Sequence, residues 1–182
     1  ITHVEELPAT ILADHCYSGM FSGTRLVEGP VLPVTDLAPY CYERMFQHCS
    51  YLTQAPALPA TQLAEGCYSA MFYGCENLAF APELPADSLV ANCYSYMFNS
   101  CMNLEYVKVG VFSLDNDVDA TMNWVSEIQH DGLFIFPCGS RYDKHGFSEV
   151  PMNFKIVASP VIVFQNPDST ILSCDTIDCG AT

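Results

Sequence analysis

The stretch GCYSAMFYGCENL at residues 66–78 is written again, with few changes, as NCYSYMFNSCMNL at residues 92–104. Two more divergent copies precede them, so that Cys-Tyr occurs four times, at residues 16–17, 41–42, 67–68 and 93–94. Met-Phe follows each of these pairs, at residues 20–21, 45–46, 71–72 and 97–98. The spacing between copies is 26 residues, except for 25 between the first two. Self-similarity at a fixed period of this length predicts a stack of structural repeats.

Each copy predicts one short helix and one short strand. A residue that favours helix N-termini stands shortly after each Leu-Pro pair, at Thr10, Thr35, Thr61 and Asp87. In the third copy, Leu63, Cys67 and Met71 are four residues apart and would form one apolar stripe of a helix. The stretch LAFAPELP at residues 78–85 is too rich in proline for a helix and fits an extended segment. We therefore expect an α/β solenoid of about four 26-residue coils, each with a short helix and a short parallel strand.

The repeat pattern LPA-x-x-LA-x-x-CY-x-x-MF-x-x-C-x-x-L resembles the leucine-rich repeats of bacterial cell-surface proteins, the BspA-like group. The resemblance covers roughly residues 5–109, and the first copy departs from it because Thr24 stands where later copies have Cys49, Cys75 and Cys101. It implies a leucine-rich-repeat fold in an exported protein, at the cell surface or outside the cell, of binding or adhesive type. The family leaves the ligand open.

The cysteines predict a packing role rather than chemistry. Cys67 and Cys75 are eight residues apart, about 12 Å along a helix, whereas a disulfide needs Cα atoms within about 7 Å. We expect them to be buried as small hydrophobic groups, which also suits threonine at position 24. The alternatives are a catalytic thiol at His15-Cys16 or His48-Cys49, for which the spacing places no base, and a zinc site, for which the C-x-x-C spacing is missing. The sequence thus predicts no enzyme, no cofactor and no metal.

Composition narrows the class of partner. The 182 residues carry a formal net charge of −15, with six basic side chains, which argues against nucleic acid and against anionic membranes. No apolar run reaches the roughly 18 residues of a transmembrane span. The first residues lack the pattern of a signal peptide, as expected for a cytosolic protein and equally for an exported one after cleavage. The oligomeric state stays open.

Three regions are expected along the chain. Residues 1–109 form the solenoid, residues 110–159 a C-terminal capping region, and residues 160–182 a hairpin-like tail. ATMNWVSEIQ at residues 120–129 resembles the helix that closes such arrays, with Trp124 covering the last coil. LFIFPC at residues 133–138 and NFKIVAS at residues 153–159 predict strands. The tail is similar to the opening strands of a bacterial β-sandwich module found on surface glycan-processing proteins.

Two further features leave alternatives open. Asp115, Asp117 and Asp119 have the spacing of a calcium loop, but Ala120 and Ser126 stand where such a loop needs glycine and glutamate. Helix capping and a solvated loop are favoured over a calcium site. Cys174 and Cys179 flank a four-residue loop and could form a disulfide or remain free thiols.

The extended segments predict a candidate ligand face. Two residues after the repeat leucine, outward positions carry Glu28, Gln54, Phe80 and Tyr106; four residues after it stand Pro30, Pro56, Pro82 and Lys108. Exposed aromatic rings on a rigid face suit a protein or a sugar ring. We expect a non-enzymatic cell-surface module that binds a host or matrix protein or a glycan through Glu28, Gln54, Phe80, Tyr106 and Lys108. The alternatives are that this edge is covered, and that the chain is a structural spacer displaying an adjoining domain.

Overall fold

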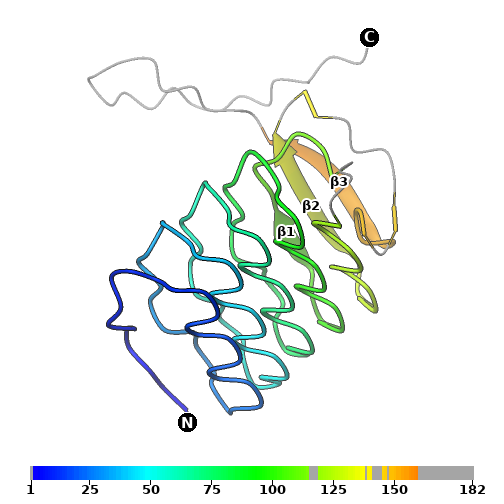
Figure 1. Cartoon of the computed structure of the whole chain (residues 1–182). Coiled ribbons are helices and arrows are strands. Elements are labelled where there is room, and N and C mark those ends of the chain that lie inside the picture. The colour runs from blue at the N-terminus through cyan, green and yellow to red at the C-terminus, as the bar shows by residue number, and fades with distance from the viewer. Residues whose placement is uncertain (1, 115–118, 138, 141–144, 147, 160–182) are drawn as a thin grey trace, which may run out of the picture.

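The computed structural model describes residues 2–114, 119–137, 139–140, 145–146 and 148–159 (Figure 1). Three short strands occur in this part: β1 (Tyr106–Lys108), β2 (Gly132–Pro137) and β3 (Phe154–Ser159). They form a parallel sheet in the order β1-β2-β3, in which Tyr106 pairs with Leu133 and Gly132 with Phe154. The expected tail at residues 160–182 lies outside the described residues.

The predicted leucine-rich-repeat solenoid with a helix in each coil is wrong, because none of the described residues is in a helix. Runs of overlapping turns take the place of the predicted helices. In these runs every second N–H donates to the carbonyl three residues earlier, as Met20 N does to Tyr17 O (3.2 Å). The alternate N–H groups donate to the following copy, as Phe21 N does to Met45 O (2.9 Å). We call one such run a turn ribbon.

A left-handed residue at every fourth position explains why the ribbon is not a helix. The φ angles of these left-handed residues lie between 49° and 70°, a region that costs a residue with a side chain about 1–2 kcal/mol. The apolar residues therefore recur every four residues because of the turn period, whereas a helix has 3.6 residues per turn. Fifteen residues share this conformation: His15, Gly19, Gly23, Tyr40, Arg44, His48, Gly66, Ala70, Gly74, Asn92, Tyr96, Ser100, Asp119, Asn123 and Glu127.

A fifth turn ribbon occupies the stretch predicted as the closing helix, residues 120–129. Asp119, Asn123 and Glu127 are its left-handed residues. It bonds to the fourth ribbon in the same way as the others, since Tyr94 N donates to Ala120 O at 2.8 Å. The five ribbons lie side by side, as the parallel loops of Figure 1 show.

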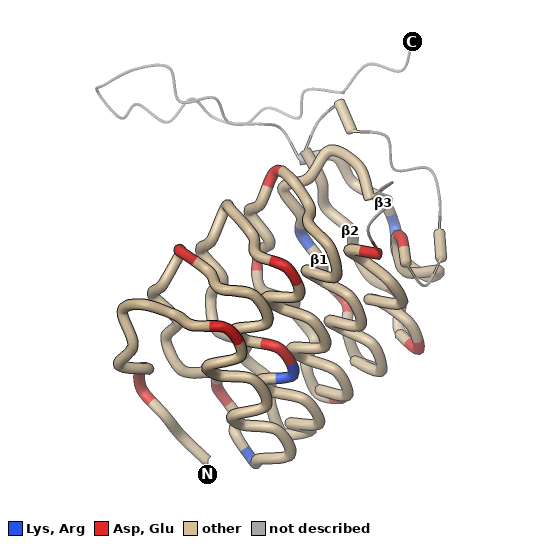
Figure 2. The backbone as a smooth tube through the Cα atoms, viewed as in Figure 1, with Lys and Arg blue, Asp and Glu red and all other residues tan. Residues whose placement is uncertain are grey.

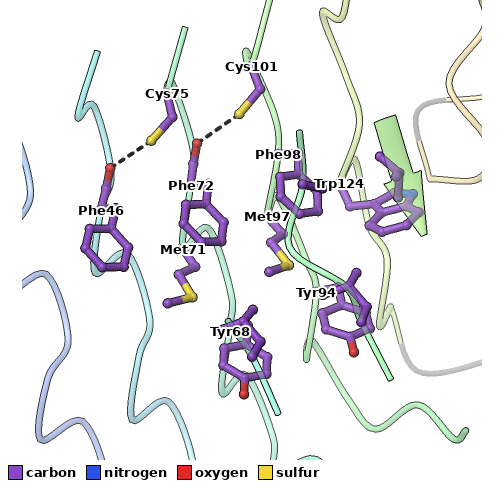
Figure 3. Packing of buried hydrophobic residues seen from close by; sticks show 14 of the residues in the cluster. Phe46, Tyr68, Met71, Phe72, Cys75, Tyr94, Met97, Phe98, Cys101 and Trp124 are labelled. Carbon is purple, nitrogen blue, oxygen red and sulfur yellow. Dashed lines mark hydrogen bonds between the residues drawn. The ribbon is translucent and has the colours of Figure 1, made fainter. Parts of the chain in front are cut away.

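Equivalent side chains form columns in the core. The rings of Tyr42 and Tyr68 stack with centroids 6.0 Å apart. Those of Phe46 and Phe72 stack with centroids 5.6 Å apart (Figure 3). Trp124 ends both columns, because its ring lies 6.2 Å from that of Tyr94 and 6.1 Å from that of Phe98. The columns bury large apolar areas, which is the main favourable term for folding.

Substitutions at two left-handed glycines distinguish a ribbon from a helix. We expect Gly19→Ala to lower the free energy of unfolding by about 1 kcal/mol, because an added Cβ meets nothing within 4 Å but φ is +63°. In a helix the same change would raise it by about 1 kcal/mol. Gly66→Ala should cost more, since its Cβ would lie 2.2 Å from Cε1 of Tyr40. Urea unfolding of both variants measures the sign; stabilisation by Gly19→Ala would contradict the ribbon.

Candidate ligand face

The residues predicted to form the ligand face occupy equivalent positions on successive copies. Parallel bridges join Glu28 to Gln54 and Phe80 to Tyr106, and Tyr106 pairs with Leu133 of β2. Backbone hydrogen bonds hold the aromatic pair in register, since Ala81 N donates to Tyr106 O at 3.0 Å. We call Glu28, Gln54, Phe80, Tyr106 and Leu133 the outward column.

The C-terminal half of the outward column is apolar and open to solvent. Phe80 is 62% exposed and Leu133 is 41% exposed. The ring centroids of Phe80 and Tyr106 are 6.2 Å apart at an angle of 47°. Leu133 was missed in the sequence because it stands 27 residues after Tyr106, one more than the repeat period. The alternation of β2, which buries Phe134 and exposes Leu133, is the signal that could have identified it.

The proline positions behave differently from the prediction. Pro30 and Pro56 are buried rather than presented outward, and Pro82 is half-buried. A Cβ on Gly29 would lie 2.4 Å from Cδ of Pro56, so the ring of one copy packs over the glycine of the previous one. Pro56 and Pro82 instead line an open groove of about 520 Å³ beside the outward column, formed by Ala55, Pro56, Ala57, Leu58, Pro59, Pro82, Glu83 and Pro85.

Lys108, the remaining predicted face residue, pairs with an acidic neighbour. Its Nζ lies 2.8 Å from Oε1 of Glu83, and both side chains are substantially exposed. An exposed pair of this kind contributes less than about 1 kcal/mol to stability, so the ammonium group can exchange its partner. Figure 2 shows acidic residues recurring along the stacked copies, while basic residues stand at separate points.

The cysteines connect neighbouring copies through hydrogen bonds. Sγ of Cys75 donates to the carbonyl of Phe46 at 3.1 Å, and Sγ of Cys101 donates to that of Phe72 at 3.1 Å (Figure 3). Cys75 and Cys101 are both buried and form no disulfide, and the same holds for Cys49. Thr24 takes the equivalent position in the first copy, with its Oγ1 3.4 Å from Sγ of Cys49. The predicted packing role of these residues is thus accompanied by a donor role.

In the two His-Cys pairs, each histidine ring lies against an aromatic ring of the following copy. The ring of His15 stacks on Tyr40 with centroids 5.0 Å apart, and His48 meets the ring of Tyr73 at 5.2 Å. Sγ of Cys49 donates to a backbone carbonyl at 3.0 Å.

The described residues include no group of three or more histidine, cysteine, aspartate or glutamate side chains that could hold a metal ion. Asp119 belongs to the fifth ribbon; Asp115 and Asp117 lie outside the described residues, as do Cys174 and Cys179. Within the same part of the chain, no helix has the length and apolar character needed to span a membrane.

Comparison with known proteins adds no relative: no family model, curated protein or solved structure matches the chain. The resemblance of the repeat pattern to BspA-like proteins therefore stays a prediction. These comparisons give no support to an adhesive role.

Removal of one bridging thiol should weaken the core. We expect Cys75→Ala to lower the free energy of unfolding by about 1–2 kcal/mol, since it leaves a small cavity and removes the bond to Phe46 O. That carbonyl keeps the bond from Cys49 N at 3.0 Å, which limits the loss. Cys16→Ala is the matched control: Cys16 is exposed, and the change should stay within about 0.5 kcal/mol. Equal losses in urea unfolding would contradict this account.

Alkaline pH should destabilise the fold. Burial raises the pKa of Cys93 to about 11 and that of Cys101 to about 12, whereas an unfolded thiol has a pKa of about 8.5. Above that value the unfolded chain releases protons that the folded chain keeps, so the free energy of unfolding falls as pH rises. The expected loss by pH 10 is on the order of 1–2 kcal/mol for each buried thiol. A flat profile from pH 8 to pH 10 in urea unfolding would contradict the burial of the thiols.

Proposed function

We propose that the protein is a non-enzymatic binding module that takes a protein or a glycan through the outward column. The observation that carries the proposal is the aromatic pair of Phe80 and Tyr106: Phe80 is 62% exposed although its backbone is held by parallel bridging to the half-buried Tyr106. Large apolar side chains grouped on a rigid surface are typical of interaction sites.

The geometry of the pair supports binding rather than packing. The equivalent position in the preceding copy, Gln54, is polar and exposed. In the other direction along the outward column, Leu133 extends the apolar surface. A ligand that covers Phe80 and Leu133 would remove apolar area from water at about 25 cal/mol per Å². The backbone bonds between copies already fix the spacing of the rings, so little conformational entropy is lost on binding.

Polar groups beside the apolar surface can orient a ligand. Glu28 and Gln54 supply acceptors and an amide donor, and the exposed ammonium group of Lys108 supplies further donors. Sugar rings present apolar faces and hydroxyl groups together, and protein surfaces combine the same elements. We further propose that the partner is a host or matrix molecule and that the protein is exported to the cell surface or beyond; the resemblance of the repeat pattern supports this.

A second candidate function is that of a structural spacer that displays an adjoining domain. The uninterrupted hydrogen bonding between neighbouring copies favours it, since such a ladder makes a stiff rod without any ligand. The two functions differ in what the outward column does, because a spacer does not need the solvent-facing ring of Phe80.

Substitution of the aromatic pair tests the proposal. The protein is applied to arrays of immobilised glycans and of extracellular proteins, alongside Phe80→Ala/Tyr106→Ala. We expect captured partners to bind the double variant at least about tenfold more weakly, because contacts to two aromatic rings are lost. Phe112→Ala is the control, since Phe112 is 52% exposed and outside the outward column. The proposal fails if the double variant binds every partner as the unchanged protein does, or if the arrays yield no partner.

A further inference from the structure

The backbone hydrogen bonds between neighbouring turn ribbons run in one direction along the stack. The alternate N–H groups of one ribbon donate to carbonyls of the following ribbon, as Tyr17 N does to Cys41 O (3.0 Å) and Tyr42 N to Cys67 O (3.0 Å). Carbonyls that point the other way accept from the preceding ribbon. In the first ribbon these carbonyls accept no backbone bond from the described residues; they belong to Asp14, Cys16, Ser18, Met20 and Ser22. This edge, which we call the first edge, therefore offers acceptors alone.

Side chains that are buried in later copies are open at the first edge. Met20 is 51% exposed, whereas Met45 is fully buried. Cys16 is exposed, whereas Cys41 is buried. Ile11, in the same copy, is 87% exposed. The edge thus combines unsatisfied acceptors with apolar side chains, which is the combination that templates the addition of another backbone.

Thr24 occupies the position at which later copies bond to the copy before them. In later copies the equivalent residue reaches the Phe carbonyl of the preceding copy, as Cys49 does to Phe21 at 3.0 Å and Cys75 to Phe46 at 3.1 Å. The Thr24 hydroxyl takes the place of that thiol in the first copy, and because the Cys49 proton goes to Phe21, Thr24 is the donor in its 3.4 Å contact with Sγ of Cys49.

The opposite end of the stack is already covered. Asn123 N donates to Oγ of Ser148 at 2.9 Å, and Thr121 Oγ1 donates to the carbonyl of Ser148 at 2.8 Å. The indole N–H of Trp124 donates to the carbonyl of Glu149 at 2.7 Å. Donors of the fifth ribbon are thereby satisfied by the segment that follows it.

We propose that the first edge is a docking surface for one further turn ribbon of the Cys-Tyr-x-x-Met-Phe type. Such a ribbon presents a row of N–H groups at two-residue intervals, which the row of carbonyls in the first ribbon matches. A second molecule of this chain does not fit. Its first edge also offers carbonyls, and its other end is covered by Ser148 and Glu149.

The test supplies the occupant on the same chain. A duplicate of residues 58–83 is inserted between Glu6 and Leu7, which preserves the Leu-Pro spacing. We expect oxidation of Met20 by hydrogen peroxide, and alkylation of Cys16 by N-ethylmaleimide, to slow at least about tenfold, because both become interior. Mass spectrometry of peptides reads each residue separately, with Met45 as the internal standard for a folded chain.

A matched control carries Gly66→Pro and Gly74→Pro within the duplicate alone. The two prolines remove two N–H donors of the duplicate, and their fixed negative φ is incompatible with the positive φ of these glycines. Protection of Met20 in the extended chain and not in the control supports the proposal; unchanged rates in an extended chain with protected Met45 overturn it. Should the extended chain not fold, a synthetic peptide of residues 58–83 is titrated into the original protein, and absence of protection overturns the proposal. Self-association of the original protein that protects Met20 also overturns it, in favour of a second copy.

Discussion

The structure depends on a division of the backbone N–H groups between two directions. Within a turn ribbon, one N–H closes a turn, as in Ser18 N to His15 O (3.1 Å), and the next reaches the neighbouring copy, as in Gly19 N to Glu43 O (2.8 Å). An α-helix uses its N–H groups internally, so neighbouring helices meet only through side chains. Here the lateral bonds fix the distance and the register between copies.

Fixed register explains the uniform columns of the core. Because one copy cannot slip against the next, equal residues meet, and Tyr68 stacks on Tyr94 at 6.3 Å. The cysteine that closes the second, third and fourth ribbons must be small enough to be buried and must offer a donor to the Phe carbonyl of the preceding copy, and both conditions hold for Cys75 and Cys101. Burial of these columns offsets the cost of the left-handed residues.

The sequence predicted the repeat period, the buried thiols of Cys41 and Cys67, and the common row of Phe80 and Tyr106, because each depends only on spacing. It did not predict the ribbon, since residues four apart suit a helix almost equally well. Glycine, asparagine, aspartate and histidine occupy nine of the fifteen left-handed positions, and these residues tolerate positive φ. That recurrence, every fourth residue, was the signal against a helix. The burial of Pro56 depends on its contact with Gly29 of another copy, which no single-copy pattern contains.

The same register separates the core from the candidate ligand face. Inward positions must repeat because each stacks on its equivalent, but the outward column faces solvent and is free to change from copy to copy. It does so, from Glu28 and Gln54 at one end to Phe80, Tyr106 and Leu133 at the other. A ligand lying along the stack would therefore meet polar acceptors first and an apolar surface next, at a spacing that the backbone alone determines. Under the proposed binding function, single outward substitutions would change specificity without any cost to the columns that hold the molecule together.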